Sequence, residues 1–328
     1  MSGVQQISVS ADETGMRLDR WFKTHFPGLN FGRLQKLLRS GQVRVDGARV
    51  KTNHRLDAGA VVRVPPLDDD AQAPKPPRQE RARSESPLAK LILHEDETLM
   101  VLNKPHGLAS QGGPGVSRHV DGMLDTLRDA KGQKPRLVHR LDKDTSGCLV
   151  VAKTRLAASA LAKTFRSRSA RKIYWALVVG APKPPQGKIS TWLKRHGPKG
   201  DERMIVARHG EEGADHAVTH YAVIESAARR YAWMSLKPVT GRTHQLRVHM
   251  QHLGTPILGD PRYFDRQNFE FPAGLQNKLH LLARRITLPH PDGGTLDVTA
   301  PLPPHMQQSC AVLGMNPANM SEDMFEQD

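Results

Sequence analysis

The chain has little of what stabilises exported or membrane-bound proteins. It contains only two cysteines, Cys148 and Cys310, which are too few for a disulfide framework or a zinc site built from thiolates. It has no run of eighteen apolar residues and no hydrophobic signal core near the N-terminus. We therefore expect a soluble protein of the reducing cytoplasm, with no membrane partner.

Aromatic residues are also scarce, at 5%, and acidic residues are outnumbered by basic ones, 33 to 48. The resulting formal net charge of +15 is typical of proteins that bind nucleic acid. A role at a membrane surface would require a cationic helix with a broad apolar face, and the sequence contains none. The composition therefore predicts a nucleic acid as the partner.

The 328 residues are too many for one small core and suggest two domains. Residues 1–65 predict a small α/β domain, and residues 66–88 are so polar and proline-rich that they predict a flexible linker. In residues 89–315, many strands alternate with few helices. This pattern predicts an α+β domain with a long mixed, mainly antiparallel β-sheet flanked by helices and loops. Residues 184–215 are expected to be irregular, and residues 316–328 to form a disordered tail.

In the first domain, the apolar spacing predicts two helices. One spans about residues 18–26, and the second has Phe31 on its apolar side and stops at Gly41. Residues 43–50 predict a hairpin around a type I′ turn. The polar face of the second helix and the adjoining hairpin carry five cations: Arg33, Lys36, Arg39, Arg44 and Arg49. They form either an ordinary solvated surface or a contiguous basic surface for RNA.

Residues 137–147 place two carboxylates, two cations and a histidine in a turn between two apolar runs. A turn at the edge of a rigid sheet commonly carries reacting groups, although a solvated loop with an ion pair has the same composition. By composition alone, Asp142 and Asp144 are both candidates for a reactive carboxylate.

The order of residues in this turn, His-Arg-Leu-Asp-x-x-Thr-Ser-Gly at 139–147, resembles the signature of the RluA-type pseudouridine synthases. Residues 172–180 resemble the second motif of that family, Lys-x-Tyr-x-Ala-x-Val-x-Gly, and residues 240–249 resemble the third. The resemblance implies an isomerase that breaks the N1–C1′ bond of a uridine in RNA and rejoins the base through C5. Such a reaction involves no redox change, so the resemblance implies neither metal nor cofactor.

The resemblance also implies catalytic roles for three residues. Asp142 is the catalytic aspartate, acting either as a nucleophile at the sugar or as the base that starts a glycal route. Tyr174 stacks on the uracil and helps remove the C5 proton, although its place in a strand pattern equally fits a core tyrosine. Arg247 pairs with Asp142, because an adjacent guanidinium favours the charged carboxylate.

Three further residues are implied as RNA contacts. Arg140 is expected to reach into the RNA and stabilise a flipped-out nucleotide. Arg242 and His244 are expected to contact RNA or to stabilise their turn. A metal site formed by His244, His249 and His252 is not indicated, because no cysteine or acidic residue joins them at a recognised ligand spacing.

The first domain resembles the RNA-binding domain named for ribosomal protein S-four. Its position ahead of the synthase motifs resembles the family members that modify large-subunit (23S) ribosomal RNA. The resemblance therefore implies ribosomal RNA as the partner of a monomeric enzyme. Two other functions fit parts of the sequence: a non-catalytic ribosomal-RNA-binding or ribosome-assembly factor, and an RNA N-glycosidase that would release free uracil.

Overall fold

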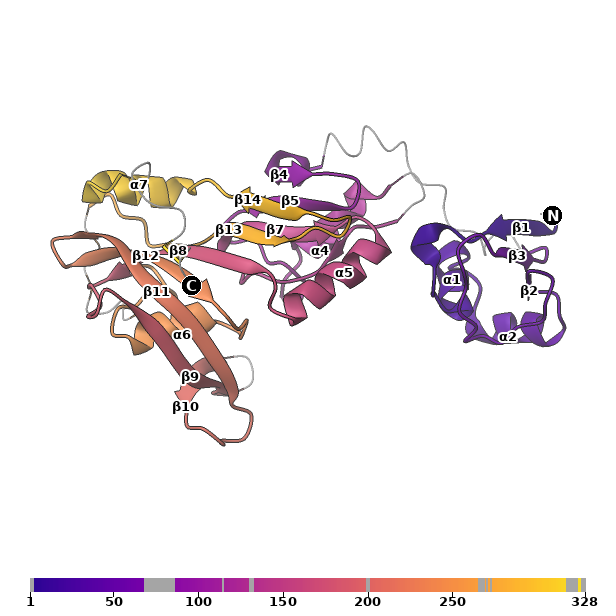
Figure 1. Ribbon diagram of the computed structural model, residues 1–328, viewed down its shortest axis with the longest axis horizontal. Helices are drawn as coiled ribbons and strands as arrows, with labels where there is room; N and C mark the ends of the chain where they lie inside the picture. The colour runs from indigo at the N-terminus through magenta and orange to yellow at the C-terminus, as the bar shows by residue number, and fades with distance from the viewer. Residues whose placement is uncertain are drawn as a thin grey trace. The chain divides into compact units, whose positions relative to one another are not determined.

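The structure is a computed structural model that describes residues 3–67, 86–113, 115–129, 133–198, 201–264, 269, 271, 273–316 and 324–325 (Figure 1). The chain folds into two compact units. The first comprises residues 1–79 with the short segments 130–132 and 154–156, and the second comprises the remainder. Within the described ranges, no helix is long and apolar enough to cross a membrane.

The predicted flexible linker and disordered tail lie largely outside the described residues. Two described residues of the predicted linker belong to the cores instead: Leu67 is buried in the first unit and Leu88 in the second. The segment between the two cores is therefore shorter than residues 66–88. At the other end of the chain, Phe325 is buried against the main core of the second unit.

The first unit combines a three-stranded antiparallel sheet with two helices. The sheet has the order β1-β3-β2, and the helices bury their apolar sides against it. The amide oxygen of Asn30 caps the start of α2 by accepting from the backbone N–H of Arg33, and Gly41, at φ +72°, ends it as predicted. The elements are β1 (Gln5–Ser8), α1 (Leu18–His25), α2 (Phe31–Arg39), β2 (Arg44–Val45) and β3 (Val61–Val64).

Two expectations for this unit were wrong. Phe31 is 55% exposed instead of packing with the apolar side of α2. The predicted turn is present, with positive φ at both Asp46 and Gly47 and an antiparallel bridge between Val45 and Ala48, but residues 48–50 do not continue as a strand. β2 pairs with β3 instead, because that register places the side chains of Val45 and Val62 in the core.

The second unit contains an eleven-stranded mixed sheet, and the predicted α+β fold with a mainly antiparallel sheet is confirmed. The strand order is β10-β9-β11-β12-β8-β13-β7-β5-β4, with β14 paired to β13 and β6 paired to β7. The only parallel pairing between its described strands joins β13 and β7. The strands are β4 (Ile92–Glu95), β5 (Leu99–Lys104), β6 (Arg136–Leu137), β7 (Ser146–Ala152), β8 (Arg171–Val179), β9 (Gln186–His196), β10 (Arg203–Ala207), β11 (Asp215–Ala227), β12 (Tyr231–Pro238), β13 (Leu281–Pro289) and β14 (Thr295–Thr299).

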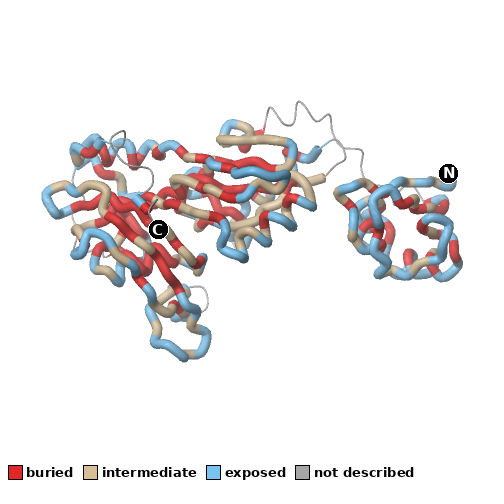
Figure 2. The backbone as a smooth tube through the Cα atoms, viewed as in Figure 1, coloured by how far each residue is buried: buried red, intermediate tan, exposed pale blue. Residues whose placement is uncertain are grey.

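The two faces of the central strands enter different cores, and Figure 2 shows these strands as mostly buried. On β8, Trp175 and its alternate neighbours join the largest apolar cluster, whereas Tyr174 packs on the opposite face with residues of α6. This is the alternation that the sequence predicts for 173–177. Tyr174 therefore faces the helix formed by the third motif.

The helices of the second unit are α4 (Val120–Met123), α5 (Arg155–Arg166), α6 (Gln245–His252) and α7 (Pro304–Leu313), with 3-10 turns η3 (Ala89–Leu91) and η4 (Leu124–Leu127). The first unit has one 3-10 turn among its described residues, η1 (Ala11–Glu13).

Residues 184–215 were expected to be irregular, and this expectation was wrong. They form β9, β10 and the start of β11, which project from the rest of the sheet in Figure 1. On β9 only one face is apolar, and there Ile189 and Leu193 are buried. Apart from Trp192, the side chains on the other face are polar or basic, and the flanking turns are basic and glycine-rich, so the composition did not reveal the strand.

Candidate active site

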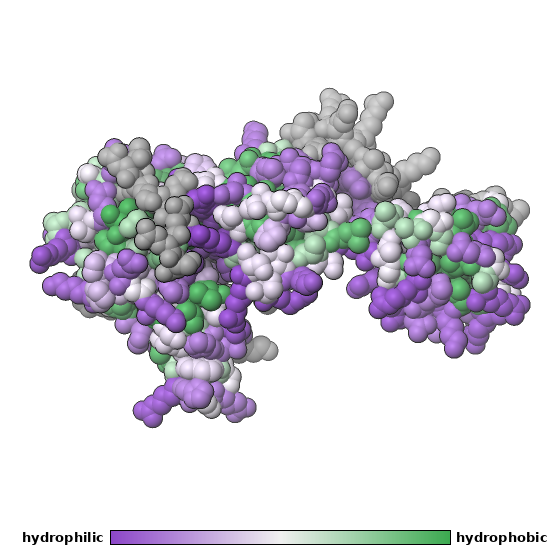
Figure 3. Space-filling view, in the orientation of Figure 1, coloured by the Kyte–Doolittle hydropathy of each residue, from purple (hydrophilic) through white to green (hydrophobic). Residues whose placement is uncertain are grey.

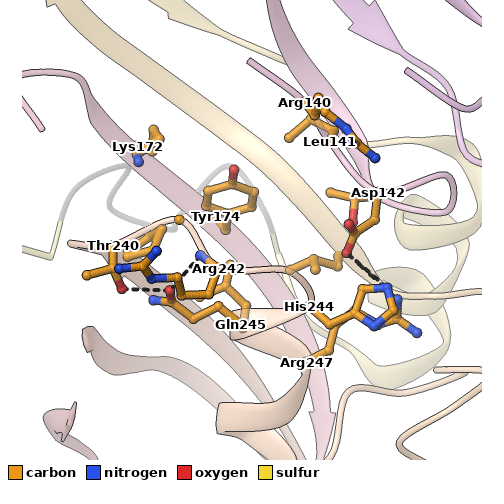
Figure 4. Close-up of a pocket in the computed structure, with 15 residues that line it drawn as sticks. Arg140, Leu141, Asp142, Lys172, Tyr174, Thr240, Arg242, His244, Gln245 and Arg247 are labelled. Atoms are coloured by element: carbon orange, nitrogen blue, oxygen red, sulfur yellow. Dashed lines mark hydrogen bonds and ion pairs between the residues drawn. The ribbon is translucent and has the colours of Figure 1, made fainter. Parts of the chain in front are cut away.

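A pocket of about 120 Å³ lies where the loop between β6 and β7 meets the start of β8 and the start of α6. It opens beside a wider groove of about 740 Å³, which shares Asp142 and Tyr174 with it. In Figure 4 the carboxylate of Asp142 points toward His244 and Arg247, while Tyr174 and Lys172 lie across from it. The pocket is lined by six residues of functional interest: Arg140, Asp142, Tyr174, Arg242, His244 and Arg247. The structure therefore brings all the predicted site residues of this unit together.

The backbone that carries Asp142 is clamped from both sides. The Ser110 hydroxyl accepts from the N–H of Leu141 at 3.0 Å and donates to its carbonyl at 2.7 Å. On the other side, the carbonyl of Lys143 accepts from the Lys104 ammonium at 2.9 Å and from the N–H of Gly107 at 3.0 Å. These bonds hold the loop in place without using the Asp142 side chain.

Lys104 is fully buried, with no exposed surface. Its Nζ donates to three backbone carbonyls, those of Pro105, Leu108 and Lys143. Only the protonated ammonium has three N–H donors, so this geometry fits the charged form. Burial lowers the pKa of Lys104 to about 7, and the nearby carboxylates of Asp144 and Asp142 partly oppose that shift.

Within the signature, His139 is structural. Its Nε2 accepts from the backbone N–H of Val150 at 2.8 Å, and its ring stacks on Phe165. Burial lowers the pKa of His139 to about 3, so the ring is neutral at ordinary pH. Gly147 is required at its position because its φ is +104° and a Cβ there would overlap the carbonyl oxygen of Ala283 on β13.

Arg247 is nearly buried, at 4% exposure, and its main partner is one that the sequence did not predict. Its guanidinium binds Asp260 through two hydrogen bonds of 2.7 Å, and the Asp260 carboxylate is fully buried. Its Nη1 lies 3.7 Å from Oδ2 of Asp142. The expected pairing of Arg247 with Asp142 is therefore a looser ion-pair contact, made by an arginine that Asp260 already holds in place.

His244 also faces Asp142, with its Nε2 at 3.9 Å from Oδ2. The hydroxyl oxygen of Tyr263 accepts from the backbone N–H of Met204, so its own proton is free to donate to Nδ1 of His244, 2.8 Å away. When Tyr263 donates in this way, the proton of the neutral ring lies on Nε2, the nitrogen that faces the carboxylate. Burial lowers the pKa of His244, and Asp142 opposes this effect.

Tyr174 lines the pocket from β8, and its hydroxyl makes no hydrogen bond to any described residue. Burial raises the pKa of Tyr174 above its usual value, and the negative charge of Asp142 raises it further. The phenol is therefore neutral at ordinary pH. It can donate or accept one hydrogen bond to a ligand in the pocket.

Arg140 and Arg242 lie at the mouth of the pocket in different settings. Arg140 is exposed and has no hydrogen bond or ion pair with a described residue. The guanidinium of Arg242 is held against β11. It donates to the carbonyl of His216 at 3.2 Å and lies 3.4 Å from the Asp215 carboxylate. Its turn is held by the buried amide of Gln245, which bonds Thr240, the N–H of Arg242 and β11.

The five predicted cations of the first unit differ in their exposure to solvent. Arg33, Lys36, Arg39 and Arg49 are exposed. Arg44 is half-buried and donates to the carbonyls of two glycines around its own turn. Hydrophilic side chains cover the edge of this unit where α2 lies (Figure 3). Arg39 also lines a cleft of about 630 Å³ together with Arg17 and Lys51.

Three histidines near α6 were considered as metal ligands from the sequence. His249 is fully buried, and its two ring nitrogens hydrogen-bond the hydroxyls of Thr191 and Thr219. In the part of the chain that the structure describes, no group of three or more His, Cys, Asp or Glu side chains is arranged to hold a metal ion.

Sequence reasoning missed four residues that shape the site: Lys104, Ser110, Asp260 and Tyr263. Two of them lie in short segments whose composition is distinctive in the sequence. Lys104 belongs to Asn-Lys-Pro-His-Gly, and Asp260 ends Gly-Thr-Pro-Ile-Leu-Gly-Asp. A charged residue inside an otherwise apolar or glycine-rich segment was therefore the sequence feature that could have identified Lys104 and Asp260.

Comparisons with known proteins agree with this site. A family model described as RNA pseudouridylate synthase matches residues 98–252. The ribosomal large subunit pseudouridine synthase C of Escherichia coli (strain K12) is 39% identical over 310 residues, covering 91% of this chain and 93% of the relative. The same-named protein of Pasteurella multocida is 38% identical over 316 residues and covers 94% of each chain.

Among solved structures, human RNA pseudouridylate synthase domain containing 4 superposes with a TM-score of 0.61 at 30% identity. The match covers 72% of this chain and 98% of the human one. The chain has the long sheet of these relatives, and its three motifs meet at one pocket. Together these findings place it in the class of pseudouridine synthases, which are isomerases. The chain belongs to the RNA pseudouridylate synthase family, as its resemblance to the RluA-type members predicted.

Proposed function

We propose that this protein converts specific uridines of 23S ribosomal RNA to pseudouridine, with Asp142 as the catalytic carboxylate. The observation that carries the proposal is the position of Asp142, which is held by its backbone and faces Arg247 and His244 in a small pocket opposite Tyr174. Large-subunit ribosomal RNA as substrate is supported by relatives named for it that span more than nine-tenths of the chain.

The chemistry follows from the groups in the pocket. Asp142 supplies an oxygen anion beside the sugar, where it serves as the nucleophile at C1′ or as the base of a glycal route. Arg247 and His244 attract the carboxylate and orient it. Tyr174 presents a neutral hydroxyl to the detached uracil and a ring on which the base can stack. The reaction is an isomerisation without redox change, so we infer that neither metal nor cofactor is needed. We also infer a monomer, because all of these groups come from one chain, and a cytoplasmic location, because the two cysteines are free thiols.

The test is conversion of a 23S RNA transcript by the purified protein in buffer that contains EDTA and no added cofactor. We expect pseudouridine at a small number of positions, mapped by carbodiimide labelling, and loss of the same positions in cells that lack the protein. Release of free uracil would indicate an N-glycosidase instead. Binding without any conversion of folded RNA or of assembling subunits would indicate a non-catalytic assembly factor, and activity restored only by zinc would reopen the question of a metal.

We further propose that the first unit contributes affinity for the RNA through the exposed cations of α2. Arg33 and Lys36 lie one turn apart on its solvent side. Changing both to glutamine should weaken RNA binding and lower the slope of log affinity against log salt by about 1.4 to 1.8. The rate at saturating RNA should be kept, because every proposed catalytic residue lies in the second unit.

The control for this prediction is the matched pair Arg20 and Lys23, which are spaced in the same way on the exposed side of α1. Their change to glutamine should have a smaller effect on the slope. The slopes are measured by filter binding over a range of salt concentrations. If the α2 variant and the unchanged protein have equal slopes, α2 does not contact the RNA.

A further inference from the structure

We propose that Arg166, Arg168 and Lys172 form an anion site that binds a phosphodiester of the RNA backbone next to the target nucleotide. All three line the groove of about 740 Å³ that opens beside the Asp142 pocket. The inference rests on the proposed function, because it names the part of the RNA that the groove holds while the uridine lies in the pocket.

The three residues lie on segments that border the pocket holding Asp142. Arg166 is the last residue of α5, and Arg168 lies in the turn between α5 and β8. Lys172 is on β8, two residues before Tyr174, so both side chains leave the same face of the strand. Figure 4 shows Lys172 beside Tyr174 in the pocket, and the same lysine also lines the groove.

The charges of this site are not neutralised by the protein. The side chains of Arg166, Arg168 and Lys172 have no hydrogen bond or ion pair with any described residue. Arg242, at the other side of the groove, contrasts with them because it lies 3.4 Å from Asp215. Burial lowers the pKa of Lys172, and the positive charge of Arg168 lowers it further. A phosphate placed between the two cations would remove that repulsion and supply the missing negative charge.

The backbone of Arg168 is a second, independent observation. Its φ is +63°, in the left-handed region, at the position just after a helix where glycine is normally found. The N–H of Ser169 donates to the carbonyl of Thr164, as in the usual helix ending. A side chain at this position is therefore strained, and strained residues of this kind are concentrated at functional sites.

A purely structural explanation competes with this proposal. The C-terminal end of α5 carries partial negative charge, which arginines near it also stabilise. The two explanations differ in what the loss of Arg168 changes. If Arg168 serves the helix, its loss lowers stability, whereas if it serves the RNA, its loss lowers affinity and salt dependence.

The deciding experiment replaces Arg168 with glycine, which removes the cation and relieves the left-handed strain. We expect the Tm to be kept or raised, RNA affinity to fall about three- to tenfold, and the salt slope to fall by about 0.7 to 0.9. Arg229→Gly is the matched control. Arg229 is exposed, has φ +56°, and lies in the turn before β12, at the opposite end of that strand from the pocket. It should leave affinity and slope unchanged.

A double-mutant cycle with Lys172→Gln tests whether the two cations share one ligand. If both contact the same phosphate, the double variant should lose less affinity than the sum of the single losses. Arg168→Gly with a lower Tm and an unchanged slope would overturn the proposal, as would strictly additive losses. Failure of the proposed function would be detected by a different measurement. In that case the unchanged protein would form no pseudouridine, regardless of the RNA affinities of the variants.

Discussion

Asp142→Asn should reduce pseudouridine formation by about ten-thousandfold or more while leaving RNA binding within about twofold of the unchanged protein. The amide keeps the volume of the side chain but removes the oxygen anion that the proposed chemistry requires. The loop itself should not move, because it is held by backbone bonds to Ser110 and Lys104. The measurement is tritium release from RNA labelled at uridine C5, in parallel with filter binding.

Asp144→Asn is the control for this prediction. Asp144 lies two residues away in the same loop, but its Oδ1 approaches His106 at 3.8 Å and it does not line the pocket. We expect it to retain most of the activity. Appreciable tritium release by the Asp142 variant, together with its loss in the Asp144 variant, would reverse the assignment.

Arg247→Met should cost about 3 to 5 kcal/mol of unfolding free energy as well as most of the activity. The change leaves the fully buried Asp260 carboxylate without its bidentate partner and removes the guanidinium 3.7 Å from Asp142. Stability is measured by urea unfolding of the full-length protein, and activity at a temperature where the variant remains folded.

A matched control is Arg285→Met, which breaks another bidentate arginine–aspartate pair, that between Arg285 and Asp297. This pair lies at the surface, with side-chain exposures of 25% and 39%, so its loss should cost about 1 kcal/mol or less. Equal costs for the two variants would contradict the buried-pair explanation.

The double variant Arg247→Met/Asp260→Leu separates stability from catalysis. Removing both charges should recover part of the lost stability, because no unpaired charge then stays buried. Full recovery is not expected, since Asp260 also accepts from the N–H groups of Arg262 and Tyr263. Activity should stay low, because Asp142 still lacks the guanidinium. Restored activity would show that Arg247 acts only through the fold.

The sequence by itself was sufficient where the signal is local. The order of residues around Asp142 and the motifs around Tyr174 and Arg247 predicted which segments form the pocket, and the structure places all three there. The two-residue alternation on β8 predicted that Tyr174 leaves the core face occupied by Trp175. Such patterns depend only on backbone geometry and on neighbours along the chain.

Only the tertiary structure decided which charges are buried together. Arg247 and Asp260 are separated by thirteen residues, and Lys104 lies thirty-nine residues before the carbonyl of Lys143 that it binds. From the sequence alone, charged side chains such as those of Lys104 and Asp260 are expected in solvent, because burying an unpaired charge is costly. In the folded protein each has a partner supplied by a distant segment, and that pairing makes its burial possible. Strand β9 was missed for a related reason: only Ile189 and Leu193 of its side chains are buried and apolar, and its extended backbone is held mainly by pairing with β10 and β11.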